Sequence, residues 1–523
     1  MNHPIRRRLI TLIGAVALTL AACGTNPVTG KREIQFVSES QELQMGSKQY
    51  APARQSEGGD FELLPDLTLY VNEVGQKLAA VSDRKLPYEF KVLNSSIPNA
   101  WALPGGKIAV NRGLLTELKS EAELAAVLGH EIVHAAARHG AQAQERGTLL
   151  QAGLAAAQIG AAIGDVDQQL AGLVLTGAGV GAQLVQTRYG REQELEADLY
   201  GMKYMRAAGY DPHAAVTLQE TFVRLSEGRQ ASWLEGMFAS HPPSAERVAR
   251  NRETALQLGD GGELGVSSYA ARVAPLLKVK PAYDKYDQAL AALQKKDPSR
   301  AQSLANEAVR MEPREGRFHQ LLGDIAINEK RPRDALPHYQ RAIELSPEYF
   351  GSWLGAGVAQ YRVGDKQKAK ASLTRSWELL PTAPAALFLG NLARDSGDAS
   401  GALQYYQAAA SAQGSIGEAA SREAVLLDLP NNPGKYVAAA LRDGGDGQTR
   451  LVIQNRAPVA LSDIRVTPVL VNGAQVVQQG KSVNIRGPVA AGQQVSVDSG
   501  LTSLTPEQVQ ALRFRIDTAS IAD

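Results

Sequence analysis

Apolar residues recur at helical spacing in the segment from Ser120 to Gly140. They are Leu124, Val127, Leu128, Ile132 and Ala135, which fall on one side of a helix. The segment is also rich in alanine and leucine, which favour helices. Ser120 followed by Glu123 predicts a capping box at the helix start, and Gly140 predicts its end. Residues 64–258 are mostly helical by the same criterion, with one strand-like stretch, WALPGGKIAV, at residues 101–110.

A repeat of about 34 residues, the length of a tetratricopeptide unit, runs from residue 282 to residue 415. A small residue recurs at Ala289, Gly323, Gly357 and Gly390, an alanine at Ala301, Ala335, Ala369 and Ala402, and a proline at Pro313, Pro347 and Pro381. Small residues let the two helices of a unit approach closely, and the prolines end each second helix. Four units exceed the roughly three needed for a continuous core, so an independent α-solenoid is predicted. Its concave surface is expected to recruit peptides or proteins. The alternative is a purely structural array.

The chain changes character after the repeats. Residues 429–449 contain several turn formers and predict a linker around one short helix. Residues 450–523 contain short alternating runs such as SDIRVTPVLV and QQVSVDS, separated by glycine, proline and asparagine. They predict a small antiparallel β domain, to which we assign no chemistry. The expected fold class is therefore mainly α, with a helical domain, a solenoid and a small β domain in that order.

Composition changes this picture only at the N-terminus. The 55 lysines and arginines balance 54 aspartates and glutamates, so no basic field indicates a nucleic acid partner. Residues 1–22 combine consecutive arginines with an apolar run too short to span a membrane, which predicts an export signal. Cys23, the only cysteine, ends a Leu-Ala-Ala-Cys sequence that resembles a bacterial lipobox, in which the cysteine receives a lipid. Gly24, in place of aspartate, implies an outer-membrane anchor that faces the periplasm, and residues 23–60 predict a polar tether.

The helix predicted around residue 130 carries a metal-binding pattern. LGHEIVH places His130 and His134 one turn apart, so both imidazoles can turn toward one point, with Glu131 beside it. A catalytic zinc keeps three protein ligands and one position for water. Because Cys23 is assigned to the anchor, the third ligand must be a histidine or a carboxylate. The downstream stretch REQELEAD offers Glu192, Glu194, Glu196 and Asp198, and periodicity alone does not choose among them.

Several stretches together resemble peptidase family M48, whose members are zinc metalloproteases. They are HEIVH, the later ELEAD, the GMKYMRAAGYDP that follows it, and the upstream NAWALPGG and NPVTGKR, within residues 26–250. The resemblance implies a gluzincin-type metalloprotease domain with a short edge-strand sheet, expected at residues 61–260, and one zinc ion per chain. In this family the third ligand is the glutamate of a Glu-x-x-Ala-Asp motif, which falls on Glu194.

The same resemblance implies roles for the neighbouring side chains. Glu131 is expected to take a proton from a zinc-polarised water and to pass it to the departing amine. Asp198, one turn after the third ligand, is expected to accept the outer N–H of His130 and so to fix its tautomer. Glu192 and Glu196 are interpreted as solvated charges.

WALPGGKIAV can supply an edge strand whose N–H and C=O groups pair with an extended peptide. The gluzincin fold that the chain resembles holds its substrates in this way. Asn99, Ala102 and Gly105 are therefore candidate substrate contacts. The alternative is an ordinary buried strand.

His241 lies in FASHPPSAERVAR, where the family has a His-Pro pair and a downstream arginine close to the metal. We expect it either to donate to the oxyanion during catalysis or to occupy the open zinc position as a latch. The alternative for His241 is a simple structural role beside the two prolines. Arg247 is expected to pair with a nearby acid. The remaining histidines lack a partner pattern and are expected to be structural or exposed: His139, His213, His319 and His338.

Two other stretches, residues 149–163 and 170–185, are unusually apolar. Each is shorter than about 20 residues, so neither is long enough to span a membrane. We expect buried helices near the active cleft, with helices that dip into a membrane as the alternative.

These observations predict a zinc endopeptidase that is lipid-anchored at the bacterial outer membrane and faces the periplasm. The resemblance to periplasmic members of the family implies that its substrates are misfolded or unassembled envelope proteins, and the repeats are expected to recruit substrate or an outer-membrane assembly machine. The first alternative is a chaperone or scaffold in which the repeats dominate and the protease site is latent. The second is a metal-dependent hydrolase that acts on bonds other than peptide bonds.

Overall fold

The structure, a computed structural model, describes residues 23–145, 189–227, 236–443, 449–473, 475–501 and 505–522. The chain divides into two compact units, residues 1–352 and residues 353–523. The expected export signal and the apolar stretches 149–163 and 170–185 lie outside the described residues. Among the helices that are described, none has the length and apolar character needed to cross a bilayer.

The N-terminal segment is folded, which corrects our expectation of a polar tether at residues 23–60. Strands β1 (Cys23–Thr25) and β2 (Arg32–Ile34) pair antiparallel, and helix α2 (Glu39–Ser56) follows them. The buried Tyr50 of α2 packs edge-on against Trp101, with 6.0 Å between ring centroids, and its hydroxyl donates to the Ile108 carbonyl at 2.6 Å. The helix is polar along most of its length, so its sequence lacks the apolar stripe of a helix that packs on a core.

A three-stranded sheet packs against α2. Its strands are β3 (Glu89–Leu93), β4 (Ala100–Leu103) and β5 (Lys107–Asn111). The order is β3-β5-β4, with β3 parallel and β4 antiparallel to β5. The single strand expected at residues 101–110 is thus a hairpin, and its turn holds Gly105 and Gly106 at φ of +79° and +82°, which glycine adopts most readily. Strand β4 lies at an edge of this sheet, and its four side chains are buried.

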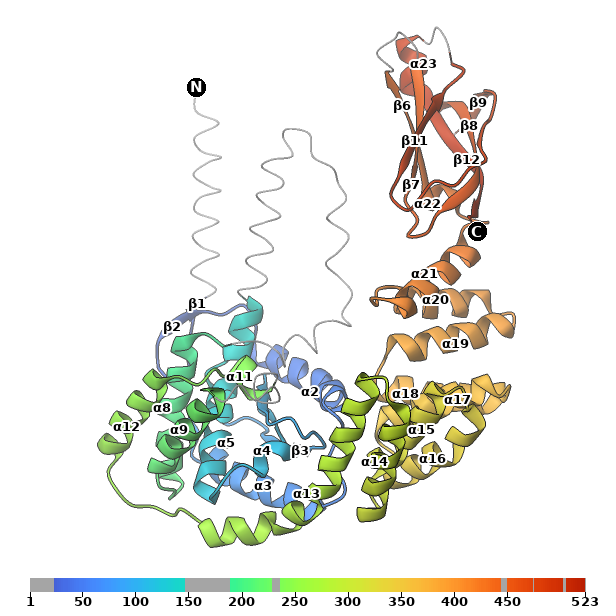
Figure 1. Ribbon diagram of the computed structural model, residues 1–523. Coiled ribbons are helices and arrows are strands. Elements are labelled where there is room, and N and C mark those ends of the chain that lie inside the picture. Colours follow the sequence, from blue (N-terminus) through green and yellow to red (C-terminus); the bar gives the residue numbers. More distant parts are fainter. Residues whose placement is uncertain are drawn as a thin grey trace, which may run out of the picture. The chain divides into compact units, whose positions relative to one another are not determined.

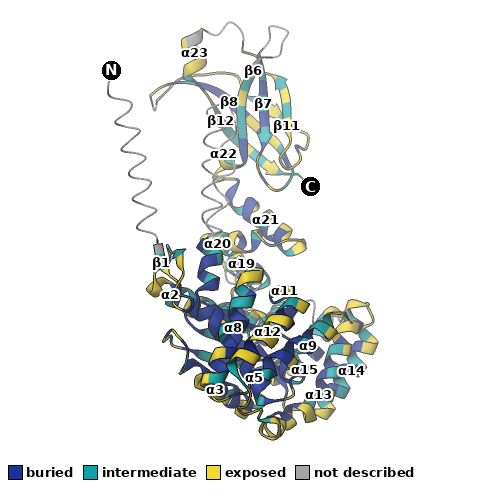
Figure 2. Cartoon of the chain, turned by 90° about the vertical axis from the view of Figure 1, so that its left-hand side faces the viewer, coloured by how far each residue is buried: buried dark blue, intermediate teal, exposed yellow. Residues whose placement is uncertain are grey.

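Helices surround this sheet and carry the histidine motif (Figure 1). They are α3 (Pro65–Ala79), α4 (Arg112–Leu115), α5 (Glu121–Ala136), α8 (Arg191–Ala207), α9 (His213–Glu227), α11 (Met237–Ser240) and α12 (Ala245–Leu258). Helix α5 is buried along nearly its whole length (Figure 2). Such burial fits its high content of alanine and leucine, because small and apolar side chains pack on all sides of a central helix.

The start of α5 has the predicted cap residue without the full capping box, and its end differs from the prediction. The Ser120 hydroxyl caps the helix by accepting the Glu123 N–H at 3.1 Å, but the Glu123 carboxylate accepts from the Lys119 N–H, so the box is not reciprocal. The helix ends at Ala136, and Arg138 has a φ of +64°, before Gly140 is reached. A left-handed arginine is an uncommon way to end a helix.

Helices α5 and α8 cross at two glycines, which sets the position of the site. A Cβ on Gly129 would lie 3.1 Å from the carbonyl oxygen of Gly201, and a Cβ on Gly201 would lie 3.0 Å from the amide nitrogen of His130. Larger residues at either position would push the helices apart. The close crossing therefore brings the histidine motif of α5 next to the acidic motif of α8.

The core of the first unit continues past residue 260, where we expected the catalytic domain to end. Helix α13 (Val266–Gln294) carries Tyr283, whose ring packs edge-on against Phe61 with 6.1 Å between centroids. The guanidinium of Arg112 stacks over the same ring at 3.4 Å, and the Tyr283 hydroxyl donates to Glu315 in the next repeat. The first repeats therefore share a core with the catalytic domain, so they do not form the independent solenoid that we expected.

The repeats themselves form the predicted helix pairs. They are α13, α14 (Pro298–Met311), α15 (Gly316–Asn328), α16 (Pro332–Leu345), α17 (Phe350–Arg362), α18 (Lys366–Leu379), α19 (Ala383–Asp395) and α20 (Ala399–Ala410). The four recurring alanines are fully buried. A Cβ on Gly323 or Gly390 would lie within 2.8 Å of the Tyr339 or Tyr406 ring, respectively. The small residues therefore permit close helix packing, as the sequence predicts.

Replacement of Gly357 by valine is expected to destabilise the repeats, because a Cβ there would lie 2.6 Å from Cγ of Leu373 on α18. Overpacking of this kind costs about 1–3 kcal/mol. Hydrogen exchange of the α17 and α18 amides measures the loss of protection. Lys370→Val, at an exposed position of α18, is the matched control. Equal loss in both variants would show that helix propensity, and not packing, is responsible.

The C-terminal region is the antiparallel β domain that the sequence predicts. After α21 (Ser415–Asp428) and the short α22 (Pro433–Tyr436) come β6 (Val437–Asp443), β7 (Thr449–Asn455), β8 (Leu461–Asn472), β9 (Gln475–Gln479), β10 (Val483–Ile485), β11 (Gln494–Asp498), α23 (Pro506–Ala511) and β12 (Leu512–Ile521). One sheet has the order β11-β7-β6, and the other joins β10, β8 and β12, with β9 also paired to β8. Part of the expected linker at residues 429–449 is therefore strand β6.

Candidate metal centre

Three segments bring their side chains to one point in the first unit. Helix α5 carries His130 and His134 one turn apart, and α8 carries Glu194. His241 follows the short helix α11, where its N–H donates to the Met237 carbonyl at 2.7 Å. All four side chains are buried, although three of them are imidazoles and the fourth is a carboxylic acid.

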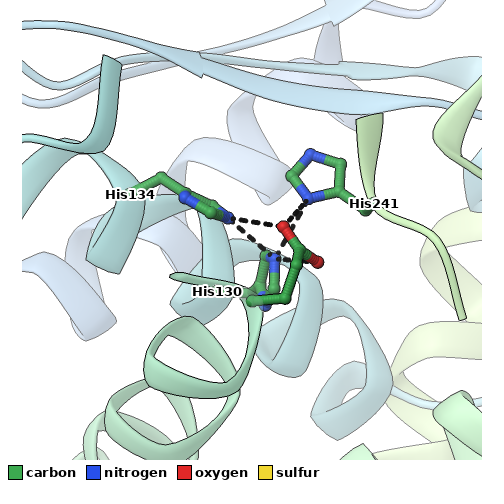
Figure 3. A group of neighbouring side chains, drawn as sticks. His130, His134 and His241 are labelled. Atoms are coloured by element: carbon green, nitrogen blue, oxygen red, sulfur yellow. Dashed lines mark hydrogen bonds and ion pairs between the residues drawn. The ribbon is translucent and has the colours of Figure 1, made fainter. Parts of the chain in front are cut away.

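The side chains of His130, His134 and His241 point toward one another (Figure 3). One ligand atom from each of them and one from Glu194 all lie within 4.8 Å of one another. Nε2 of His130 is 3.0 Å from Nε2 of His134 and 3.2 Å from Nδ1 of His241. The Glu194 carboxylate lies 3.6 Å from His130 Nε2, 3.4 Å from His134 Nε2 and 3.0 Å from His241 Nδ1.

This donor set fits a divalent cation with nitrogen and oxygen ligands. Three ring nitrogens converge on one carboxylate, and imidazole nitrogens and carboxylate oxygens are ligands that zinc takes in proteins. Oε2 of Glu194 is buried, has no hydrogen bond among the described residues, and has Nη1 of Arg247 as its ion-pair partner at 2.8 Å. Buried polar atoms are normally paired, so a cluster of converging lone pairs is the arrangement expected of ligands around a shared ion.

Behind the cluster, Asp198 and Arg247 hold His130 and Glu194 in place. Nδ1 of His130 lies 2.9 Å from Oδ1 of Asp198, the contact that the family resemblance implies. Arg247, on α12, makes two hydrogen bonds of 2.7 Å to the Asp198 carboxylate and approaches Glu194 at 2.8 Å. The guanidinium therefore compensates two buried carboxylates at once.

The surroundings of the three acids in and beside the cluster shift their pKa values in different directions. Burial raises the pKa of Glu194, but His241 and Arg247 outweigh burial and hold that pKa well below its usual range. Burial likewise opposes ionisation of Asp198, and Arg247 keeps its pKa below the ordinary value. Burial dominates at Glu131, whose pKa is raised. The two acids beside Arg247 are thus held ionised, and Glu131 is the acid with the stronger tendency to take up a proton.

Glu131 lies at the edge of the cluster. It is fully buried, and neither of its carboxylate oxygens has a hydrogen bond among the described residues. Its nearest charged neighbour is His241, whose Nε2 lies 3.5 Å from Oε1 of Glu131. Burial lowers the pKa of His241, but Glu194 and Glu131 outweigh it and raise that pKa above its ordinary value. An unpaired buried carboxylate is costly, so it has the character of a functional group and not of a structural one.

Two neighbouring residues lie closer to the cluster than we expected. His139, expected to be structural or exposed, is buried and places its Nδ1 2.8 Å from Nδ1 of His134. Glu196, expected to be a solvated charge, lies 3.3 Å from Nε2 of His139, and its side chain is 15% exposed. Glu192, in contrast, is 84% exposed, as expected. The sequence did not connect either residue with the metal site, because neither lies at helical spacing from the side chain that it contacts.

Sequence reasoning also gave no signal for Tyr189. Its ring stacks on that of His134, with 3.7 Å between centroids and an interplanar angle of 19°. This tyrosine is buried and lies just before helix α8. The stacking holds the face of the His134 ring, whereas the hydrogen bonds hold its edge.

The candidate substrate contacts are buried beside or within the edge hairpin. Asn99 is buried just before β4, and its Oδ1 has no hydrogen bond among the described residues. Ala102 is buried in β4 and pairs with Ile108. Gly105 lies in the turn, where a Cβ would lie 3.1 Å from the Cα of Leu43 on α2. The structure thus puts Gly105 against α2. Among the described residues, His213, His319 and His338 also lie outside the metal cluster.

Comparison with known families agrees with this architecture. The sequence profile of Peptidase family M48 matches residues 65–255, which contain the whole ligand cluster. The tetratricopeptide repeat profile matches residues 286–350 and 326–384.

Three relatives illustrate the extent of the similarity. The mitochondrial metalloendopeptidase OMA1 of Schizosaccharomyces pombe is 37% identical over 234 residues, 43% of this chain and 65% of the relative. The β-barrel assembly-enhancing protease of Escherichia coli K12 is 26% identical over 430 residues, 74% of this chain and 87% of the relative. Metalloprotease LoiP of the same organism is 32% identical over 192 residues, 36% of this chain and 68% of the relative.

The chain spans slightly less than two thirds of OMA1 and slightly more than two thirds of LoiP. The matched profile includes both helices that carry the histidine and acidic motifs. From this match, and from its similarity to LoiP, we conclude that the chain belongs to peptidase family M48.

Proposed function

We propose that this protein is a zinc-dependent endopeptidase. The observation that carries the proposal is the convergence of His130, His134 and Glu194 from two helices, with their ligand atoms within 4.8 Å and Glu131 beside them. Two imidazoles, one carboxylate and an adjacent unpaired glutamate are the set that metal-assisted peptide hydrolysis requires. The family is metal-dependent, and the LoiP and OMA1 relatives are named as metalloproteases.

A zinc ion held by these three ligands would supply a Lewis acid that polarises a water molecule and the scissile carbonyl. The protein supplies the proton transfers. Glu131 accepts the proton of the attacking water and then delivers it to the departing amine, and its raised pKa favours that uptake. Asp198 holds the Nδ1 proton of His130, so that Nε2 keeps its lone pair for the metal.

His241 is the fourth member of the cluster, and we assign it the role of a latch. Its Nδ1 lies 3.0 Å from Glu194 and 3.2 Å from His130 Nε2, so its lone pair points at the same place as those of the ligands. A catalytic site needs that position for water, whereas a site with four protein ligands is closed. Movement of His241 therefore opens the site, and its other nitrogen, near Glu131, becomes available to an oxyanion.

The substrate is a protein chain held in extended form along the edge strand β4. Its free edge would pair with the backbone of the substrate, and Asn99 and Ala102 are the contact residues at that strand. The buried, unpaired Oδ1 of Asn99 supports this role, because a peptide N–H would satisfy it. Gly105 remains a candidate as the turn that ends the hairpin.

We further propose that the enzyme acts at the bacterial outer membrane, facing the periplasm, on misfolded or unassembled envelope proteins. The lipobox at Cys23 supplies the lipid anchor, and the repeats recruit substrate or a partner in outer-membrane assembly. The relative that matches 74% of this chain is named a β-barrel assembly-enhancing protease, which supports this location and class of substrate. The balanced charge gives no support for a nucleic acid partner.

One observation favours the alternative of a scaffold with a latent site. With His241 inside the cluster, a bound metal would have four protein ligands, which would leave no position for water or substrate. A repeat-based chaperone needs no opening of that site.

Casein cleavage distinguishes the two functions. The wild type is expected to cleave casein, to lose activity with a chelator and to regain it with zinc. His241→Ala is expected to cleave faster, because the latch is removed. A slower His241→Ala would instead make this residue an oxyanion donor. Absence of zinc-dependent cleavage in both proteins would favour the scaffold.

A further inference from the structure

The second metal ligand of α5 is supported by a chain of side chains that the proposed mechanism does not use. Nδ1 of His134 lies 2.8 Å from Nδ1 of His139, and Nε2 of His139 lies 3.3 Å from Oε1 of Glu196. The same carboxylate oxygen accepts a hydrogen bond from Nδ2 of Asn26 at 3.2 Å. His139 and Asn26 are each only 1% exposed. This series of side-chain contacts thus runs from the metal cluster to the NPVTGKR segment near the N-terminus.

Only one arrangement of protons satisfies this chain when His134 binds a metal through Nε2. Its other nitrogen, Nδ1, then carries the proton and donates to Nδ1 of His139. His139, which accepts at Nδ1, must carry its own proton on Nε2, and that proton faces Glu196. Each donor therefore has an acceptor, and the last acceptor is a carboxylate. The network fixes the His134 tautomer that leaves Nε2 free for a metal.

An unusual turn brings His139 back to His134. Five residues along a continuing helix would place the two rings on different faces. Instead, α5 ends at Ala136 and Arg138 adopts a φ of +64°. Arg138 is held by the buried Glu42 of α2 at 3.0 Å and by a hydrogen bond to the Val37 carbonyl. A left-handed non-glycine residue held in this way is the kind of strain that is retained at functional sites.

Hydrogen bonds at both ends of its side-chain amide hold Asn26 in place. Its Oδ1 accepts the Val28 N–H at 2.9 Å, and its Nδ2 donates to Glu33 at 3.0 Å as well as to Glu196. Glu33 in turn accepts from Gln142, whose Oε1 accepts from Gln193 of α8 at 3.0 Å. The β1–β2 hairpin is therefore tied both to the segment after α5 and to α8, the two elements next to the metal ligands.

We propose that His139 is a positioning residue for the metal ligand His134, and that Glu196 and Asn26 hold its ring in place. The proposal rests on the proposed function, because it requires a metal on His134. It gives the two histidines of α5 different supports: a carboxylate touches His130 directly, whereas a second histidine stands between His134 and its carboxylate. It also gives the NPVTGKR segment a role, which is to hold Glu196 against the metal site.

The test measures zinc affinity, by competition with a chromophoric chelator, in two substitutions of matched size. His139→Leu removes both hydrogen bonds and is expected to weaken zinc binding by about 10–100-fold, the usual cost of losing a side chain that orients a ligand. His139→Gln offers an amide oxygen to His134 and an amide N–H to Glu196, and is expected to retain most of the affinity. The visible spectrum of the cobalt-loaded protein should shift in the leucine variant only.

Glu196→Gln and Asn26→Ala test the outer part of the chain. Each substitution alone should weaken zinc binding. Asn26→Ala should have little further effect when His139→Leu is already present, because the effects of residues that act through the same contacts are not additive. Glu192→Gln, on the exposed face of α8, is the matched control and should change nothing. If His139→Leu fails to fold, the Glu196 and Asn26 variants still carry the test.

The failures of the two proposals are distinguishable. Absence of zinc from the wild type would remove the proposed function, and this inference with it. A wild type that binds zinc, beside leucine and glutamine variants that bind it equally well, would overturn the positioning role alone. Equal loss in those two variants would reduce His139 to a packing residue, and would also contradict the proposal.

Discussion

Replacement of Glu131 by glutamine is expected to abolish casein cleavage while zinc remains bound. Glutamine has nearly the same shape, but it cannot take a proton from the attacking water. A positioned general base contributes about 10²–10⁴-fold to a rate, so kcat should fall by that factor. The side chain is fully buried and free of hydrogen bonds among the described residues, and the contact that the substitution weakens is its 3.5 Å ion pair with Nε2 of His241.

The informative measurement is kcat beside metal content in the same preparation. Glu192→Gln is the matched control, because it makes the same chemical change at an exposed position of α8. It should leave kcat and zinc unchanged. Cleavage at the wild-type rate by the Glu131 variant would remove the general base from this account, whereas loss of zinc would make Glu131 a ligand.

Arg247→Ala is expected to have the largest effect on stability. The arginine is buried and compensates both Glu194 and Asp198, with contacts of 2.8 and 2.7 Å. Its removal leaves two buried carboxylates without this cationic partner. Removing one partner of a buried ion pair costs about 3–5 kcal/mol, so the metal-free protein should lose roughly that amount of unfolding free energy.

Arg250→Ala, on the same helix, is the control for this prediction. Arg250 is 62% exposed and pairs with Glu253 one turn away, a kind of contact that contributes little. Urea unfolding of both metal-free variants measures the difference. A loss at position 247 no greater than that at position 250 would show that the two carboxylates do not depend on the guanidinium.

The parts of the fold that the sequence predicts are those encoded in local spacing. His130 and His134 share a helix face because they are four residues apart. The small residues of the repeats recur with one period and meet the same kind of neighbour each time, as the rings of Tyr339 and Tyr406 against Gly323 and Gly390 demonstrate. Spacing of this kind needs no knowledge of the tertiary structure.

The choice of the third ligand is different, because it depends on how two helices cross. Periodicity leaves Glu192, Glu194, Glu196 and Asp198 equivalent. The close approach at Gly129 and Gly201 turns one face of α8 toward the histidines, and this contact is long-range. Family resemblance, and not periodicity, pointed to Glu194.

Polar elements were the main source of error. Helix α2 is polar, so its sequence suggested a tether, although Tyr50 buries its ring and Glu42 holds Arg138. Glu196 was interpreted as a solvated charge for the same reason, and His139 was not connected with the metal site. Buried polar side chains are stabilised by specific partners, and partners from distant segments cannot be read from spacing.

The central claim is that side chains from α5 and α8 hold one divalent metal ion. The most direct test is stoichiometric metal analysis of the wild type beside Glu194→Ala, after dialysis against a chelator at a concentration that leaves the wild type loaded. The account predicts about one zinc ion per chain in the wild type and a clear loss in the variant, because one of the three ligands is missing. Equal zinc in both proteins, or none in either, would contradict it.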